Sequence, residues 1–274
     1  MALTASAQEC LTLAGQLLQR GDAAGAERVL APLLGNIAQA DPQLLNLAAL
    51  IRLQQNRAQE AAALFTRACD ADTRQALYAL HLGRTKTALG DPAEAIAAYR
   101  AAIRLQPGLT SAYFELAVLQ QRSGQLENAE KTYRNLLRQM PDNEQAKLML
   151  AVVLMEDARP ADAESLLRRA LSGQTDAKKQ LMLRNGLAWS LRRQNKNHES
   201  LEEFEAVRRM DPALPFVDVQ RAEILQDMQR YDEAIAIFTE GLTREPLNHH
   251  LHRFYNDLLY RLDRGEPFLL NRDA

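Results

Sequence analysis

A small residue recurs along the chain at nearly constant intervals, and this repeat restricts the fold more than any other feature. Alanine or serine occupies Ala26, Ala61, Ala95, Ala129, Ala163, Ser200 and Ala234, in steps of 35, 34, 34, 34, 37 and 34 residues. Four positions after each comes a large apolar residue: Leu30, Phe65, Tyr99, Tyr133, Leu167, Phe204 and Phe238. A fixed period of roughly 20–50 residues predicts a stack of one repeated supersecondary unit.

Each unit reads as two helices joined by a tight turn, and the segment around Gly90 shows why. A glycine takes the left-handed backbone conformation with which helices commonly end. Asp91 can then cap the next helix, and Pro92 fits its first position because no N–H is needed there. Pro107 restricts the residue before it and stops that second helix. We therefore expect an antiparallel helix pair in each unit.

The small residues have a packing role in this pattern. We expect Gly83 and Ala95 to lie where the two helices approach most closely, because bulk there would push the helices apart. Ala95, Tyr99 and Ala102 share one face of their helix at spacings i, i+4 and i+7. Tyr99 and its equivalents would then fill the space between one helix pair and the next.

The spacing resembles the tetratricopeptide repeat, which has small residues at positions 8 and 20, a large residue at 24 and proline at 32. The third and fourth units match best, with Leu82, Gly83, Ala95, Tyr99, Ala102 and Pro107, then Tyr113, Leu116, Ala117, Ala129, Tyr133 and Pro141. The resemblance covers residues 7–264 and implies an all-α fold, with residues 1–264 as a single superhelical solenoid of antiparallel helix pairs. The expected units are 7–40, 41–75, 76–109, 110–143, 144–180, 181–214 and 215–248, then a capping helix at 249–264 and a tail or linker at 265–274.

Departures from the family pattern affect the placement of two units. The family's tryptophan at position 4 is absent throughout. The fifth unit lacks its proline and runs into the polar stretch 172–180, which we expect to be a loop with three extra residues. In the second unit, the residues that best fit the core face are Leu44, Leu47, Ala48 and Ile51. The extra residue of that unit is therefore expected in the turn after Arg52.

The charge balance excludes some classes of partner. With 33 basic and 35 acidic residues and a formal net charge of -2, the chain has no excess positive charge for nucleic acid or an anionic membrane surface. Residues 1–22 lack the basic start of a secretory signal, and no apolar run is long enough to span a membrane. We therefore expect a cytoplasmic, soluble protein without membrane insertion.

The sequence contains no recognisable motif for catalysis or for a metal. The five histidines form no HExxH, and His249 and His252 have no carboxylate or cysteine in the same turn. The phosphate-binding GxxxxGK, dinucleotide-binding GxGxxG and nucleophile GxSxG patterns are also absent. We therefore expect a protein that is not an enzyme and that uses no cofactor and no metal.

The resemblance also implies where a ligand would bind, because positions 2, 5, 6, 9, 12 and 13 of each unit face the concave groove in this family. The predicted groove residues are Asn46, Ala49, Arg52, Leu80, His81, Arg84, Phe114, Glu115, Val118, Gln121, Arg122, Leu148, Met149, Val152, Met155, Asn185, Trp189, Arg192, Arg193, Phe216, Gln220, Glu223 and Asp227. The family's clamp for chaperone C-termini is absent, because Leu80 and Phe114 stand at its lysine or arginine position.

Three features of the predicted groove favour a bound peptide. Its middle is apolar, at Leu148, Met149, Val152 and Met155, and methionines adapt to varied partners. Trp189, the only tryptophan, falls at a groove position, and tryptophan is enriched in binding hot spots. Arginines for carboxylates and asparagines for a peptide backbone complete the candidate binding residues, which are Asn46, Arg52, His81, Arg84, Phe114, Val118, Arg122, Met149, Val152, Asn185, Trp189 and Arg192.

Each feature has an alternative explanation. The apolar residues are also compatible with packing against the helix of the neighbouring unit. Trp189 is also compatible with filling the gap that the extra residues of the fifth unit open. The arginines are compatible with ordinary surface charges.

The sequence thus predicts a non-catalytic protein-interaction scaffold that holds a peptide or protein segment in a concave groove. The alternative is the N-terminal recruiting domain of a larger bacterial enzyme, because the array resembles those that precede sulfotransferase, glycosyltransferase and 2-oxoglutarate oxygenase domains. Self-association through an end of the solenoid is a third hypothesis. The sequence names no specific partner.

Overall fold

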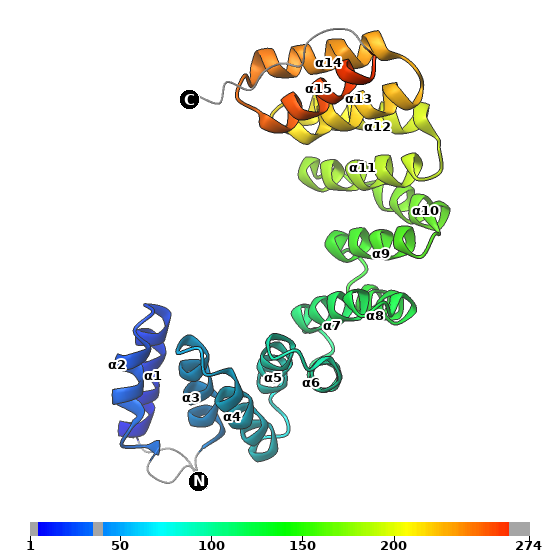
Figure 1. Ribbon diagram of the computed structural model, residues 1–274. Coiled ribbons are helices and arrows are strands. Elements are labelled where there is room, and N and C mark those ends of the chain that lie inside the picture. Colours follow the sequence, from blue (N-terminus) through cyan, green and yellow to red (C-terminus); the bar gives the residue numbers. More distant parts are fainter. Residues whose placement is uncertain (1–4, 35–40, 263–274) are drawn as a thin grey trace. The chain divides into compact units, whose positions relative to one another are not determined.

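The computed structural model describes residues 5–34 and 41–262, and within these ranges all regular secondary structure is helical. The chain forms two compact units, Met1–Pro141 and Asp142–Ala274. Both are built from helix pairs joined by short turns (Figure 1). The all-α class of fold that the sequence predicts is confirmed. That the two units continue as one solenoid stays a prediction.

Within each unit, every described helix packs against the next one in the chain. The helices of the first unit are α1 (Ala5–Gln19), α2 (Ala23–Leu30), α3 (Pro42–Gln54), α4 (Ala58–Ala71), α5 (Ala76–Ala88), α6 (Pro92–Leu105), α7 (Thr110–Arg122) and α8 (Leu126–Gln139). The helices of the second unit are α9 (Glu144–Glu156), α10 (Pro160–Leu171), α11 (Ala177–Arg192), α12 (Asn197–Met210), α13 (Pro215–Asp227), α14 (Tyr231–Arg244) and α15 (His249–Arg261).

The turn inside every helix pair has one residue in the left-handed conformation. These residues are Gly21, Asn56, Gly90, Gly124, Ala158, Asn195 and Gln229. Each lies five positions before the recurring small residue of its unit, so the turns keep the spacing of the repeat. At Gly90 the predicted glycine turn is confirmed (φ 76°), and Asp91 caps α6 by accepting a hydrogen bond from Glu94 N at 3.3 Å.

The recurring residues form the core of the helix pairs. All seven small residues from Ala26 to Ala234 are 0% exposed, and the large residues four positions later are at most 2% exposed. Gly83 shows why small residues are needed, because a β-carbon there would stand 2.6 Å from the Tyr99 ring. The expected close approach of the two helices is therefore confirmed at Gly83.

The register predicted for the second repeat, residues 41–75, is wrong. Ala49 is 0% exposed, and the left-handed residue Asn56 follows it by seven positions. Gly83 and the left-handed Gly90 of the next unit have the same separation. The turn after Arg52 therefore contains no extra residue, and the longer step of 35 residues from Ala26 to Ala61 arises before α3.

The polar stretch 172–180 is only partly a loop. α10 ends at Leu171 and α11 begins at Ala177, so residues 177–180 are helical. Asp176 caps this helix by accepting a hydrogen bond from Lys179 N at 2.9 Å. The three extra residues of the fifth repeat, 144–180, thus lengthen α11 at its N-terminal end. This helix has 16 residues, whereas α5, α7 and α9 have 13 each.

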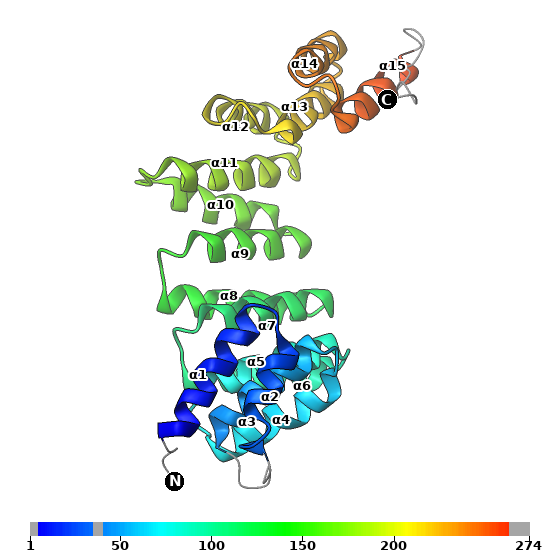
Figure 2. The ribbon, with the colours of Figure 1, turned by 90° about the vertical axis from the view of Figure 1, so that its left-hand side faces the viewer.

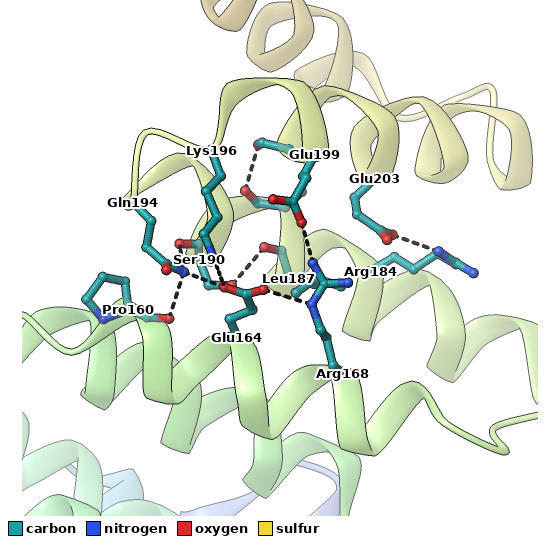
Figure 3. A network of polar contacts seen from close by, with 12 residues as sticks. Pro160, Glu164, Arg168, Arg184, Leu187, Ser190, Gln194, Lys196, Glu199 and Glu203 are labelled. Atoms are coloured by element: carbon teal, nitrogen blue, oxygen red, sulfur yellow. Dashed lines mark hydrogen bonds and ion pairs between the residues drawn. The ribbon is translucent and has the colours of Figure 1, made fainter.

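A largely buried glutamate joins α10 to the turn after α11 (Figure 3). Glu164 accepts hydrogen bonds from Lys196 Nζ at 2.7 Å, Gln194 Nε2 at 2.8 Å and Arg168 Nε at 2.8 Å. Burial disfavours the ionised carboxylate, but these three donors outweigh it and lower the pKa of Glu164 to about 2. The network therefore stabilises the packing of α10 on α11 only while Glu164 is ionised.

The last described helix, α15, packs against α13 and α14 (Figure 2). Leu251 and Leu258 are each 1% exposed, whereas Tyr260 is 77% exposed. α15 thus covers the last helix pair with one face, as the prediction of a capping helix requires. The tail predicted at 265–274 lies outside the described residues. No described helix combines the length and the apolar character needed to cross a membrane.

Candidate functional site

The second unit has an apolar pocket whose walls come from α9 and α11. These two helices, each the first of its pair, contact each other, and Figures 1 and 2 show where they lie in the fold. Its volume is about 480 Å³. Its apolar lining consists of Leu148, Met149, Val152, Met155, Met182 and Trp189. The four residues predicted as the apolar middle of the groove therefore line one hollow, and their side chains are not all consumed by packing between helices.

The pocket residues recur at fixed offsets from the buried small residue of each helix. On α9 the apolar ones lie three and two positions before Ala151, and one and four positions after it. On α11, Asn185 and Trp189 lie three positions before and one position after Ala188. Met182, six positions before Ala188, was missed among the candidate residues, although Gln145 lines the pocket from the same offset before Ala151 on α9.

Gly186 makes room for one wall of the pocket. A β-carbon at Gly186 would stand 2.9 Å from Cδ2 of Leu148, so only glycine lets this leucine of α9 lie against the backbone of α11. Sequence reasoning also missed Gly186 as a pocket residue. The sequence could have identified it, because Gly186 lies two positions before the buried Ala188, the same offset that Met149 has before Ala151.

Trp189 is held by contacts on two sides. Its ring packs edge-on against Phe204 of α12 with centroids 6.0 Å apart, and the guanidinium carbon of Arg192 lies 5.9 Å from the Trp189 centroid. The extra residues of the fifth unit form the first turn of α11, about three turns away along the helix. They open no gap at Trp189, so the gap-filling explanation is wrong.

Two arginines that were predicted as ligand anchors already have partners inside the protein. Arg84 donates from Nε and Nη2 to one oxygen of Glu115, at 2.7 and 2.5 Å. Arg192 donates from Nη1 to Glu223 at 2.8 Å and to Gln220 at 2.7 Å. In both pairs the glutamate follows the arginine by 31 positions, on the first helix of the next pair. These arginines connect neighbouring repeats.

Arg52 does not belong to the predicted groove face. It donates from Nη1 to Glu27 at 2.5 Å, and its Nε lies 3.5 Å from Glu60. Both glutamates lie on second helices of pairs, α2 and α4. Arg52 follows the buried Ala49 by three positions, an offset at which α9 contributes no pocket residue. The wrong register of α3 placed both Arg52 and Ala49 in the groove.

The other candidate residues of the first unit stand at pocket offsets on α3, α5 and α7. Asn46 Oδ1 lies 2.9 Å from His81 Nδ1, and burial lowers the pKa of His81, which favours the neutral ring. Phe114 packs edge-on against the core tyrosine of α8, with centroids 5.7 Å apart. Val118 is 37% exposed, and Arg122 is also exposed. The structure thus brings Asn46 and His81 together and leaves Val118 and Arg122 accessible.

Titratable groups beside this face are part of structural contacts. Tyr99 donates a hydrogen bond to Glu115 Oε2 at 3.0 Å, and burial raises the pKa of Tyr99 to about 12. Glu115 thereby connects Tyr99 of α6 to Arg84 of α5. In the part of the chain that the structure describes, no three histidine, cysteine, aspartate or glutamate side chains are grouped so that they could hold a metal ion.

Comparison with known sequences identifies the repeat. Three family models, each described as tetratricopeptide repeat, match residues 80–134, 120–185 and 219–246. A TPR repeat-containing protein of Treponema pallidum (strain Nichols) is 40% identical over 98 residues, which are 35% of this chain and 12% of that protein. The matched segment therefore spans about an eighth of the length of this relative.

Three solved structures with similar folds are distant in sequence. A tetratricopeptide repeat protein from Parabacteroides merdae has a TM-score of 0.58 at 18% identity, covering 93% of this chain and 100% of that one. The TPR protein YrrB has a TM-score of 0.52 at 20% identity, covering 74% of this chain and 99% of that one. The Naa15/Naa10 structure has a TM-score of 0.55 at 19% identity, covering 94% of this chain and 39% of that one. These likenesses concern the fold alone.

Proposed function

We propose that this chain, as a tetratricopeptide-repeat protein, is an interaction scaffold and binds a peptide segment of a partner protein in the pocket on α9 and α11. The apolar lining of this pocket carries the proposal. Six apolar side chains meet around about 480 Å³ on a face where a solvated groove would be polar. A concave, mostly apolar site with a few polar groups is the usual form of a ligand site.

Two proteins of similar fold support a role in protein binding. YrrB has an unusual peptide-binding site, and Naa15/Naa10 is bound to HypK-THB. In this chain the residues proposed to contact the peptide first are Met149, Val152, Asn185 and Trp189, because they line the pocket. Trp189 supplies the largest rigid surface among them, as hot-spot residues commonly do.

The corresponding face of the first unit is proposed as a further binding surface. Asn46, His81, Phe114, Val118 and Arg122 stand there at the offsets of the pocket residues. Phe114 and Val118 offer apolar contact, and the Arg122 guanidinium offers a charge. Arg84 and Arg192 have a supporting role, because their glutamate partners already neutralise them. Arg52 is not part of the proposed surface.

The proposal is tested by selecting a phage-displayed library of random peptides on the full chain. Selected peptides are then synthesised and titrated while the fluorescence of Trp189 is measured, because the chain has one tryptophan and it lines the pocket. We expect saturable changes in this fluorescence. Met149→Lys should abolish them, because an ammonium group in an apolar pocket would lose its hydration.

Met210→Lys is the matched control. Met210 is an exposed methionine of the same unit, at the end of α12 and outside the pocket, so its variant should bind the peptides as the wild type does. Circular dichroism establishes that both variants are folded. A library from which no peptide alters Trp189 fluorescence, or peptides that bind Met149→Lys unchanged, would contradict the proposal.

A further inference from the structure

The chemistry of the pocket also points to the kind of segment that it binds. We propose that the bound peptide carries a large apolar side chain and, a few residues away, an aspartate or glutamate whose carboxylate binds Arg193. This inference rests on the proposed function, because it needs a peptide in the pocket on α9 and α11. Two neighbouring arginines, one unpaired charge and one buried oxygen carry it.

Arg192 and Arg193 are consecutive but have different surroundings. The guanidinium of Arg192 is bonded to Gln220 and Glu223 and lies against the Trp189 ring. Arg193 lines the pocket and is exposed, and its guanidinium forms no hydrogen bond or ion pair with the described part of the chain. Arg193 is therefore the arginine of this site that has a free charge for a ligand.

The unpaired charge at the pocket is positive. Glu156 and Arg193 are the charged side chains among its lining residues, and Glu156 already has an interaction within the protein. A ligand with a carboxylate is therefore complementary to the pocket, whereas a lysine or arginine would meet a like charge. An arginine guanidinium suits this partner because it can donate two parallel hydrogen bonds to a carboxylate.

Asn185 indicates that the ligand has a peptide backbone. Its Oδ1 is buried and accepts no hydrogen bond from the described residues, although Asn185 lines the pocket. A buried acceptor without a donor is unfavourable, so an N–H group of a bound peptide would be stabilised there. An aliphatic chain without N–H groups would leave this oxygen unpaired. The free acceptor thus favours a peptide over a lipid or another purely apolar ligand.

The positions of Asn185 and Arg193 set the spacing within the peptide. Arg193 caps the C-terminal end of α11 and follows Asn185 by eight positions, which corresponds to about 12 Å along the helix axis. An extended peptide advances about 3.3 Å per residue, so about three to four residues cover this length. The apolar side chain lies between the two contacts, over Met149 and Val152. In an extended segment of this length, we assign the carboxylate at Arg193 to an aspartate or glutamate side chain.

The test uses the peptides selected on the full chain. We expect them to be enriched in a large apolar residue with an aspartate or glutamate about one to three positions away. Replacing that acid by glutamine, or changing Arg193→Glu in the protein, should weaken binding by about threefold to tenfold, since one exposed ion pair is lost or reversed. Higher salt should reduce the difference, because the pair is solvent-exposed.

Charge reversal on both sides provides a stricter criterion. A peptide with lysine in place of its acid should bind Arg193→Glu more tightly than it binds the wild type. Arg209→Glu is the matched control, because Arg209 is an exposed arginine of the same unit on α12, outside the pocket. Its affinity for the acidic peptides should equal that of the wild type. Arg193→Gln gives a second variant, which removes the positive charge without adding a negative one.

The outcomes separate this inference from the proposed function. If peptides alter Trp189 fluorescence and lose binding with Met149→Lys, but carry no acid or bind Arg193→Glu unchanged, the function stands and the role of Arg193 is wrong. If a free C-terminal carboxylate is needed, and the amidated peptide with its internal acid does not bind, the proposed source of the carboxylate is wrong. If no peptide binds, the proposed function itself fails.

Discussion

The Tyr99 ring of α6 lies directly on the backbone of Gly83 in α5, where a β-carbon would stand 2.6 Å from the ring. The Tyr99 hydroxyl is fixed as well, by Glu115 at 3.0 Å and by Thr87 at 3.1 Å. The ring therefore has little freedom to move away from an added methyl group.

We expect Gly83→Ala to lower the free energy of unfolding of the first unit by about 1–3 kcal/mol, because the added atom overpacks this contact. Urea unfolding followed by circular dichroism measures the change. Gly15→Ala in α1 is the control, because no atom lies within 4 Å of a β-carbon there. That variant should be stabilised by about 0.5–1 kcal/mol through helix propensity. Equal stability of Gly83→Ala and wild type would show that Tyr99 moves at no cost.

Phe238 tests the other recurring position, the large residue. It is 0% exposed in α14, and its ring lies 5.8 Å from that of Tyr255 in α15. Phe238→Ala should destabilise the second unit by about 3–5 kcal/mol, because a cavity is left beside the capping helix. Phe216→Ala removes the same side chain from a site that is 41% exposed and should cost much less. Thermal unfolding of both variants measures the difference. Similar midpoint temperatures would contradict the assignment of the recurring large residues to the core.

The spacing of the repeats was predictable from the sequence because it depends on the volume of the side chains at the recurring small and large positions. Ala95 and Tyr99 recur with their equivalents at every unit, and each one is buried where the spacing placed it. The register of α3 was not predictable from hydrophobicity, because Leu44 and Leu45 are both buried, at 3% and 2% exposure. A helix packed on two sides buries two neighbouring faces. The constant separation of twelve residues between small residues, as from Ala49 to Ala61, would have decided the register.

The pairing of the groove arginines was harder to predict, because it depends on side-chain conformations. The sequence shows an arginine at Arg84 and an acid at Glu115 but not that they meet. Their separation of 31 residues recurs between Arg192 and Glu223, and it is three less than the usual period. That spacing places the two residues about one turn apart on adjacent first helices, and it is the signal by which sequence reasoning could have found both pairs.

Ala158 provides a test of the turns. It has a φ of 56° in the turn between α9 and α10, the position that Gly124 occupies one repeat earlier. The left-handed conformation costs a residue with a β-carbon about 1–2 kcal/mol. Ala158→Gly should therefore stabilise the second unit. The gain should reach only about 1 kcal/mol, because glycine also increases the entropy of the unfolded chain and this offsets part of it. The reverse change, Gly124→Ala, should destabilise the first unit; opposite signs in urea unfolding are the required result.

The pH dependence of the second unit depends on Glu164. Its pKa is lowered from 4.5 to about 2 in the folded protein, so folding favours the ionised carboxylate. The resulting stability is fully present above about pH 4.5 and is lost as the pH falls through about 2. Glu164→Gln removes the charge that Lys196 and Arg168 bind, and should cost about 1–3 kcal/mol at neutral pH.

The difference between wild type and Glu164→Gln should therefore shrink steadily from pH 4.5 towards pH 2, because the wild-type carboxylate becomes protonated. Urea unfolding at a series of pH values, followed by circular dichroism, measures this difference directly. Taking the difference removes the contribution of the other carboxylates that titrate in the same range. Glu202→Gln, at an exposed glutamate of α12, is the control and should differ little from wild type at any pH. A gap between wild type and Glu164→Gln that stays constant down to pH 2 would mean that the three donors do not recognise the charge of Glu164.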